Sequence, residues 1–151
     1  MDKTLLVAQI IQVIEQELQN ASKAALESAQ EATDEESRAE NKYDTRALET
    51  SYVATAQAGY AKDMKQALQA YKNLNLPNDS STGPAAIGSL VTTLGSAGRE
   101  VFFIGPARGG LELETESGPI TVVTPKSPLG SQMIGKSLGQ DAGGRKILRL
   151  S

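Results

Sequence analysis

Residues 7–28 read VAQIIQVIEQELQNASKAALES, a run of helix formers in which apolar or small residues recur alternately four and three positions apart. These positions are Val7, Ile11, Ile14, Leu18, Ala21, Ala25 and Ser28. A second series with similar spacing occupies Thr50, Val53, Gln57, Tyr60, Met64, Ala67 and Tyr71. Such spacing is typical of the seam between two packed helices. The sequence therefore predicts two helices that pack along their length.

Pairing the two series places the turn between the helices. If Val7 lies opposite Tyr71 and Ile14 opposite Met64, the helices run antiparallel and the chain folds back near residue 39. A register shifted by one heptad would move this turn by a few residues. Two segments, 33–36 and 37–40, have the Ser/Thr-x-x-Glu form of a capping box, which starts a helix. We therefore expect an antiparallel coiled-coil hairpin, with arms about 45 Å long at 1.5 Å rise per residue.

The composition changes after residue 76. All six Pro and 13 of the 14 Gly lie from Pro77 onward. Short apolar stretches bounded by turn residues predict strands, and these stretches are 89–94, 100–104, 111–115, 120–124 and 145–150. We expect an α+β protein with three parts. They are a helical hairpin over 1–76 with an acidic tip near 33–44, a linker over 77–84 and a small sheet domain over 85–151.

Composition excludes several functions. The 151 residues include no Cys and no His, which excludes disulfides, thiol nucleophiles, His-based proton transfer and Cys/His zinc sites. The net charge of −3 gives no positive field that would attract DNA or an anionic membrane. The apolar run at 5–14 is interrupted by Gln9 and Gln12, is too short to span a bilayer and precedes no cleavage site. We expect a cytoplasmic protein without independent DNA or membrane binding.

Acidic residues gather around the predicted turn, with only Arg38 and Lys42 as basic neighbours. They are Glu31, Asp34, Glu35, Glu36, Glu40 and Asp44. The simplest interpretation is a solvated segment whose acids cap a helix N-terminus and offset its dipole. The alternative is that hard oxygen ligands at the end of a long rod are delivered to a divalent cation such as Mg²⁺ inside another molecule.

Three further segments carry local signals. In 124–136, Ser127 suits a helix N-cap, Pro128 a first helical turn and Gly135 a C-terminal stop, which predicts one short helix. Its default role is packing, because neither its Ser nor its Lys has an activating partner. The glycine-rich segment 105–110 predicts a turn and lacks the Lys-Ser/Thr ending of a phosphate loop, while 139–144 predicts a hairpin loop.

In order, length and motifs the chain resembles the Gre family of transcript cleavage factors of bacterial RNA polymerase. The strongest match is Ser127-Pro128-Leu129-Gly130-x-x-Met133-Ile134-Gly135-Lys136. It is similar to that family's Ser-Pro-Leu-Gly-x-x-Leu-Leu-Gly-Lys segment. A weaker match, Glu40-Asn41-Lys42-Tyr43-Asp44-Thr45, is similar to the family's Glu-Asn-Ala-Glu-Tyr run but is one residue shorter.

The resemblance implies an FKBP-like C-terminal domain that docks on the rim of the polymerase secondary channel while the hairpin enters it. It also implies that tip carboxylates share a Mg²⁺ ion with the polymerase, so that the polymerase cleaves backtracked RNA and remains the enzyme. This protein would then have no catalytic residues of its own and no stably bound cofactor. The C-terminal end is shorter than in the family, with 145–150 in place of a full hairpin, which suggests that the sheet lacks a strand.

The resemblance also assigns candidate site residues. The candidate Mg²⁺ ligands in the complex are Asp34, Glu35, Glu36, Glu40 and Asp44. The candidate tip framework is Ser37, Asn41 and Tyr43. The candidate polymerase-docking residues are Ser127, Pro128, Leu129, Gly130, Gly135 and Lys136.

The tip departs from the family pattern of an Asp and a Glu three residues apart. If Tyr43 anchors the alignment, the pair falls on Glu36 and Ala39. If the Glu-Asn dipeptide at position 40 anchors it, the pair falls on Ser37 and Glu40. One carboxylate is missing in either alignment, so neighbouring acids would have to replace it.

Three functions stay open. The first is a factor of the polymerase secondary channel, which either stimulates RNA cleavage or only competes for the channel. Such a factor contacts nascent RNA only within the polymerase complex. The second is a prolyl isomerase, which is disfavoured because the C-terminal half offers only Phe102 and Phe103 for an aromatic pocket. The third is a coiled-coil adaptor for another partner. Few exposed apolar residues are predicted on the hairpin, so we expect a monomer.

Overall fold

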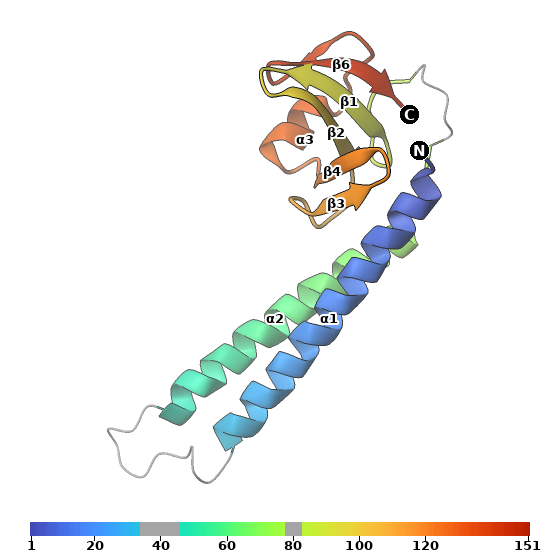
Figure 1. Cartoon of the computed structure of the whole chain (residues 1–151). Coiled ribbons are helices and arrows are strands. Elements are labelled where there is room, and N and C mark those ends of the chain that lie inside the picture. The colour runs from blue at the N-terminus through green and yellow to red at the C-terminus, as the bar shows by residue number, and fades with distance from the viewer. Residues whose placement is uncertain (34–45, 78–82) are drawn as a thin grey trace. The chain divides into compact units, whose positions relative to one another are not determined.

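The computed structural model describes residues 1–33, 46–77 and 83–151 (Figure 1). Two helices, α1 (Lys3–Thr33) and α2 (Arg46–Lys72), precede six strands and a short helix, α3 (Pro128–Met133). The strands are β1 (Leu90–Gly95), β2 (Gly98–Ile104), β3 (Glu112–Thr115), β4 (Gly118–Val123), β5 (Asp141–Ala142) and β6 (Arg145–Leu150). This order of elements confirms the predicted α+β class. Of the helices in the described ranges, none has the length and apolar character needed to cross a membrane.

The chain forms two compact units, and the boundary between them falls inside the helices. One unit is Gln12–Leu68, and the other combines Met1–Ile11 with Gln69–Ser151. The first turns of α1 and the end of α2 therefore belong to the same unit as the sheet. The division expected from composition, at residues 76 and 85, stays a prediction.

Within Gln12–Leu68, the predicted seam residues with a described side chain are buried or half-buried, with one exception. Ile14 of α1 and Met64 of α2 are buried, as expected. The predicted position of Tyr60 in the seam is wrong, because this residue is 43% exposed. Ala61 is half-buried and Leu68 is buried, so the apolar stripe of α2 is displaced by one position there. A small Ala suits close helix packing better than a large aromatic ring does. The residue pairs across the seam stay a prediction.

The six strands form one sheet in the order β3-β4-β2-β1-β6-β5. All neighbouring pairs are antiparallel except β2 and β4, which are parallel. β5 and β6 form a hairpin around Gly143 and Gly144, whose φ angles of 62° and 79° suit a tight two-residue turn. The C-terminal end is therefore a hairpin whose turn lies within the predicted loop over 139–144, and β5 is a strand that the sequence does not predict.

One face of the sheet packs against α3 in a hydrophobic cluster. Its buried members are Ala85, Val91, Phe102, Ile104, Val123, Met133, Ala142, Ile147 and Leu150. On the other face Phe103, Val122 and Ile120 are also buried. Side chains alternate between faces along each strand, so β2 and β4 are apolar on both sides. This explains why their sequences read as continuous apolar runs rather than alternating ones.

Candidate functional site

The segment with the strongest family match forms a capped helix directly after β4. The Ser127 hydroxyl accepts hydrogen bonds from the amides of Thr124 and Gly130, both at 3.1 Å, and donates one to the Thr124 carbonyl at 2.8 Å. Pro128 lies in the first turn, where a missing amide proton costs little. The predicted N-cap and first turn are therefore confirmed.

Two glycines of this segment meet different backbone requirements. Gly130 is buried, and a Cβ atom there would overlap the Thr124 carbonyl group. Gly135 follows the helix end with a φ of 78°, a left-handed conformation that favours Gly. The Gly135 amide donates to the Ala85 carbonyl at 2.8 Å, and the Ala85 amide donates to the Lys136 carbonyl at 2.7 Å. These bonds tie the segment to the start of the sheet region.

The six docking candidates divide by exposure. Pro128, Gly135 and Lys136 are exposed, while Leu129 packs against the core cluster. Ser127 and Gly130 serve the local backbone, as the hydrogen bonds and the close approach to Thr124 indicate. The exposed members are the ones that a partner can reach. Docking itself stays a prediction for all six.

Replacing Ser127 with alanine is expected to lower the free energy of unfolding by about 1–2 kcal/mol, because the helix loses its cap and two amides lose their acceptor. Urea denaturation of the full chain measures this loss. Ser131→Ala is the matched control, since the exposed Ser131 hydroxyl only donates to the Pro128 carbonyl. A control as destabilised as Ser127→Ala would contradict the capping role.

Two residues hold the helix ends within the sheet-containing unit. The Tyr71 hydroxyl of α2 donates to the Ala107 carbonyl at 2.8 Å, and the side chain is only 1% exposed. Gly105 leaves room for this hydroxyl, which a Cβ atom would displace. The Lys3 ammonium group of α1 donates to the Pro77 carbonyl at 2.8 Å. The sequence predicts neither hydrogen bond. Its spacing places Tyr71 in the seam, and a backbone carbonyl acceptor cannot be recognised from residue types.

The environment of Tyr71 disfavours its ionised form. Burial raises the pKa of the Tyr71 phenol well above its ordinary value, and the nearby positive charge of Arg108 opposes this shift without cancelling it. Arg108 itself adopts a left-handed backbone with a φ of 59°. The predicted turn over 105–110 therefore contacts α2 through the hydrogen bond from Tyr71 to the Ala107 carbonyl.

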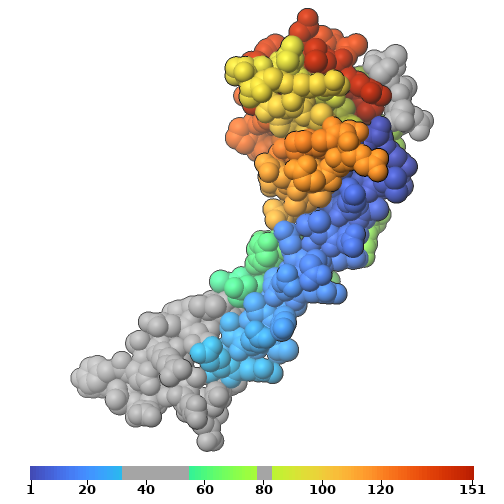
Figure 2. Space-filling model, in the orientation of Figure 1, coloured from blue at the N-terminus to red at the C-terminus, as the bar shows by residue number. Residues whose placement is uncertain are grey.

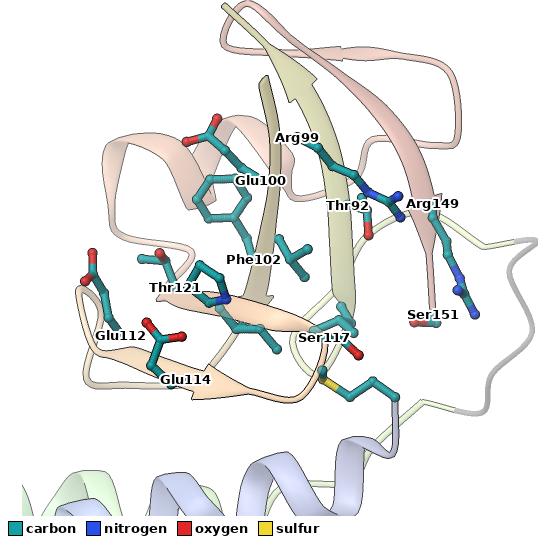
Figure 3. A pocket seen from close by; sticks show the side chains of 15 residues that line it. Thr92, Arg99, Glu100, Phe102, Glu112, Glu114, Ser117, Thr121, Arg149 and Ser151 are labelled. Carbon is teal, nitrogen blue, oxygen red and sulfur yellow. The ribbon is translucent and has the colours of Figure 1, made fainter. Parts of the chain in front are cut away.

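A pocket of about 760 Å³ lies where β2 and β4 separate (Figure 3). The two strands pair only over their last residues, from Phe102 to Ile104 on β2. Figure 3 shows Arg99 and Arg149 on one side of the pocket and Glu112 and Glu114 on the other. The pocket therefore has one basic and one acidic wall, and no sequence motif predicts it.

The predicted tip residues lie outside the described residues. They are Asp34, Glu35, Glu36, Ser37, Glu40, Asn41, Tyr43 and Asp44. Within 1–33, 46–77 and 83–151, no three acidic side chains gather closely enough to hold a metal ion. A role of the tip in metal binding therefore stays a prediction.

No family model matches the chain, and no curated protein matches it. A solved structure described as that of the transcription factor Gfh1 is similar at 18% identity with a TM-score of 0.34. The match covers 95% of this chain and 86% of that chain.

Proposed function

We propose that this protein binds in the secondary channel of a bacterial RNA polymerase and stimulates cleavage of backtracked RNA. The observation that carries the proposal is the segment Ser127–Lys136, which matches the Gre pattern in sequence. In the structure, Ser127, Gly130 and Gly135 each meet a specific backbone requirement of a capped helix. The order of a helix pair followed by a small sheet supports the same family of partners.

In this proposal the sheet region is an FKBP-like domain that docks on the channel rim, and the exposed Pro128 and Lys136 contribute to docking. The two helices form a coiled-coil hairpin that enters the channel. α1 has 31 residues, which corresponds to about 46 Å at 1.5 Å rise per residue. Such a length suits a probe that reaches a site deep inside a partner.

The tip carboxylates Asp34, Glu35, Glu36, Glu40 and Asp44 would supply oxygen ligands of the kind that Mg²⁺ prefers. A Mg²⁺ ion shared with the polymerase would polarise the phosphodiester and activate water. The polymerase would remain the enzyme, and the tip would serve as a source of ligands.

The test uses stalled, backtracked polymerase complexes with labelled RNA. We expect the protein to accelerate RNA shortening. A variant with Asp34→Asn, Glu35→Gln, Glu36→Gln, Glu40→Gln and Asp44→Asn should bind the polymerase but lose this stimulation. The control neutralises exposed acids of the described helices, Glu27→Gln and Asp63→Asn, and should stimulate normally.

Each outcome separates the alternatives. Binding without RNA shortening would remove cleavage and leave a channel competitor. Absence of polymerase binding would remove the proposal altogether. If the tip variant kept its full effect, the acids would have no part in the function, and a coiled-coil adaptor would explain the chain better.

A further inference from the structure

Three cationic side chains lie on the face of the sheet opposite α3. Arg99, Leu94 and Lys146 are direct partners across β2, β1 and β6. Thr92 and Arg149 are partners in the neighbouring row on the same face. Strands lie about 4.8 Å apart, so the three cations share a narrow area. Figure 3 shows Arg99 and Arg149 on the same side of the sheet, with Thr92 between them.

This part of the sheet is open. Ile147 and Leu150, the sequence neighbours of Lys146 and Arg149, belong to the core cluster with Met133 of α3. The cations therefore project away from α3. Figure 2 shows the yellow segment of β1 and β2 and the red segment of β6 open at the surface.

Acids lie near this area without pairing with its cations: Asp141 is the direct partner of Lys146 across β5 and β6, and Glu112 and Glu114 form the opposite wall of the pocket that Arg99 and Arg149 line. Arg99, Lys146 and Arg149 form no ion pair with any residue in the described ranges. The nearest acid along β2, Glu100, projects from the other face and accepts a bond from Arg145 at 2.7 Å. A local concentration of cations in a chain with a net charge of −3 does not follow from overall composition.

Two exposed leucines accompany the cations. Leu94 is 49% exposed and Leu148 is 42% exposed. Leu148 is the extra residue of a β-bulge, because Thr92 pairs with Arg149 while Thr93 pairs with Ile147. Bulges redirect side chains at the edges of regular pairing. A single exposed leucine is ordinary, but two beside three unpaired cations resemble an interface with mixed chemistry.

We propose that the surface formed by Leu94, Arg99, Lys146, Leu148 and Arg149, called here the basic sheet patch, binds an acidic amphipathic helix of a partner protein. The acids of such a helix would pair with the three cations, and its apolar side chains would cover the leucines. RNA fits less well, because the patch has no aromatic side chain on which bases could stack.

The basic sheet patch does not depend on the proposed polymerase function. The segment Ser127–Lys136 includes α3, which packs on the other face of the sheet. A partner on α3 therefore leaves the basic sheet patch accessible. Loss of binding at one surface can be measured while the other is intact.

Fluorescence anisotropy with three labelled probes tests the proposal on the full chain. The first probe is a peptide of about 18 residues, or five helical turns, with Glu on one face and Leu on the other. The second has Gln in place of every Glu, and the third is single-stranded RNA. We expect the Glu peptide to bind more tightly than the other two and to lose affinity with added salt.

Charge reversal by Arg99→Glu, Lys146→Glu and Arg149→Glu is expected to weaken Glu-peptide binding about tenfold or more. Leu94→Ser with Leu148→Ser should weaken it several-fold at unchanged charge. The matched control, Lys62→Glu, Lys65→Glu and Lys126→Glu, changes the net charge equally at exposed positions off the patch and should keep wild-type affinity.

If the triple reversal fails to fold, as circular dichroism would show, Lys146→Gln with Arg149→Gln replaces it and should still weaken binding. Four results would overturn the proposal. They are no binding of the Glu peptide, equal affinity for the Gln peptide, tighter binding of RNA, and equal weakening by the control variant.

Discussion

Replacing Tyr71 with alanine is expected to lower the free energy of unfolding by about 3–5 kcal/mol. The Tyr71 side chain is 1% exposed, and its hydroxyl donates to the Ala107 carbonyl at 2.8 Å. Alanine would leave a cavity in a tightly packed region and would remove the hydrogen bond to the turn over 105–110. Urea denaturation followed by circular dichroism measures the loss. Tyr60→Ala is the control, because the exposed Tyr60 ring packs little and should cost about 1 kcal/mol or less.

Tyr71→Phe separates the hydroxyl from the ring. It keeps most of the packing and is expected to cost about 1 kcal/mol for the lost hydrogen bond. It should also change the pH dependence. The pKa of Tyr71 is raised in the folded protein, so the folded state favours the neutral phenol. Its contribution to stability is therefore complete below the ordinary tyrosine pKa of about 10 and is lost as the pH rises above it.

Above that pH the wild-type protein should lose stability more steeply than Tyr71→Phe, because the variant has no phenol to ionise at this position. The comparison uses denaturation midpoints of both proteins at rising pH, with Tyr60→Phe as a second reference. Parallel curves for wild type and Tyr71→Phe would contradict the assigned environment of Tyr71.

Gly130→Ala and Gly59→Ala are expected to change stability in opposite directions. At Gly130 the added Cβ atom would overlap the Thr124 carbonyl group, so the backbone of α3 or of the β4 end has to shift. We expect a loss of about 3 kcal/mol. Gly59 lies in α2 with no neighbouring atom near the added Cβ. Alanine there should stabilise by about 0.5–1 kcal/mol, since it favours helix over the unfolded chain.

Thermal and urea denaturation of both variants check this pair. Loss of stability at both positions would mean that the added methyl group is not accommodated in α2. A neutral Gly130→Ala would mean that the close approach of Thr124 and Gly130 can relax without cost. Either result would contradict the local geometry described above.

Local signals in the sequence predicted local structure well. The cap at Ser127, the first turn at Pro128 and the end at Gly135 depend on hydrogen bonds within a few residues, so the residue types carry the information. The strand at Arg145–Leu150 was predicted with the observed bounds. By contrast, β5 has only Asp141 and Ala142, and no two-residue pattern can show that they pair with Lys146 and Arg145.

Features that depend on distant residues were not predictable. Arg99 and Arg149 are fifty positions apart, and only the pairing of β1 with both β2 and β6 brings them to one face. The contact of Tyr71 with Ala107 joins residues that are 36 positions apart. The heptad spacing predicts Tyr60 in the seam, but the next residue, Ala61, is the half-buried one. Ala61 fits nearly the same spacing and has a smaller side chain. The tip assignments, from Asp34 to Asp44, are left to the cleavage experiment.

The position of β6 in the sheet has a consequence for protein synthesis. β6 lies between β1 and β5, and Ser151 exchanges two backbone hydrogen bonds with Leu90. The helices can form while the ribosome is still translating, since their hydrogen bonds are local. The sheet cannot close until residue 151 has left the exit tunnel. A truncation before Arg145 would leave β1 as an edge strand next to an incomplete core, and the shortened product would be a substrate for aggregation or proteolysis.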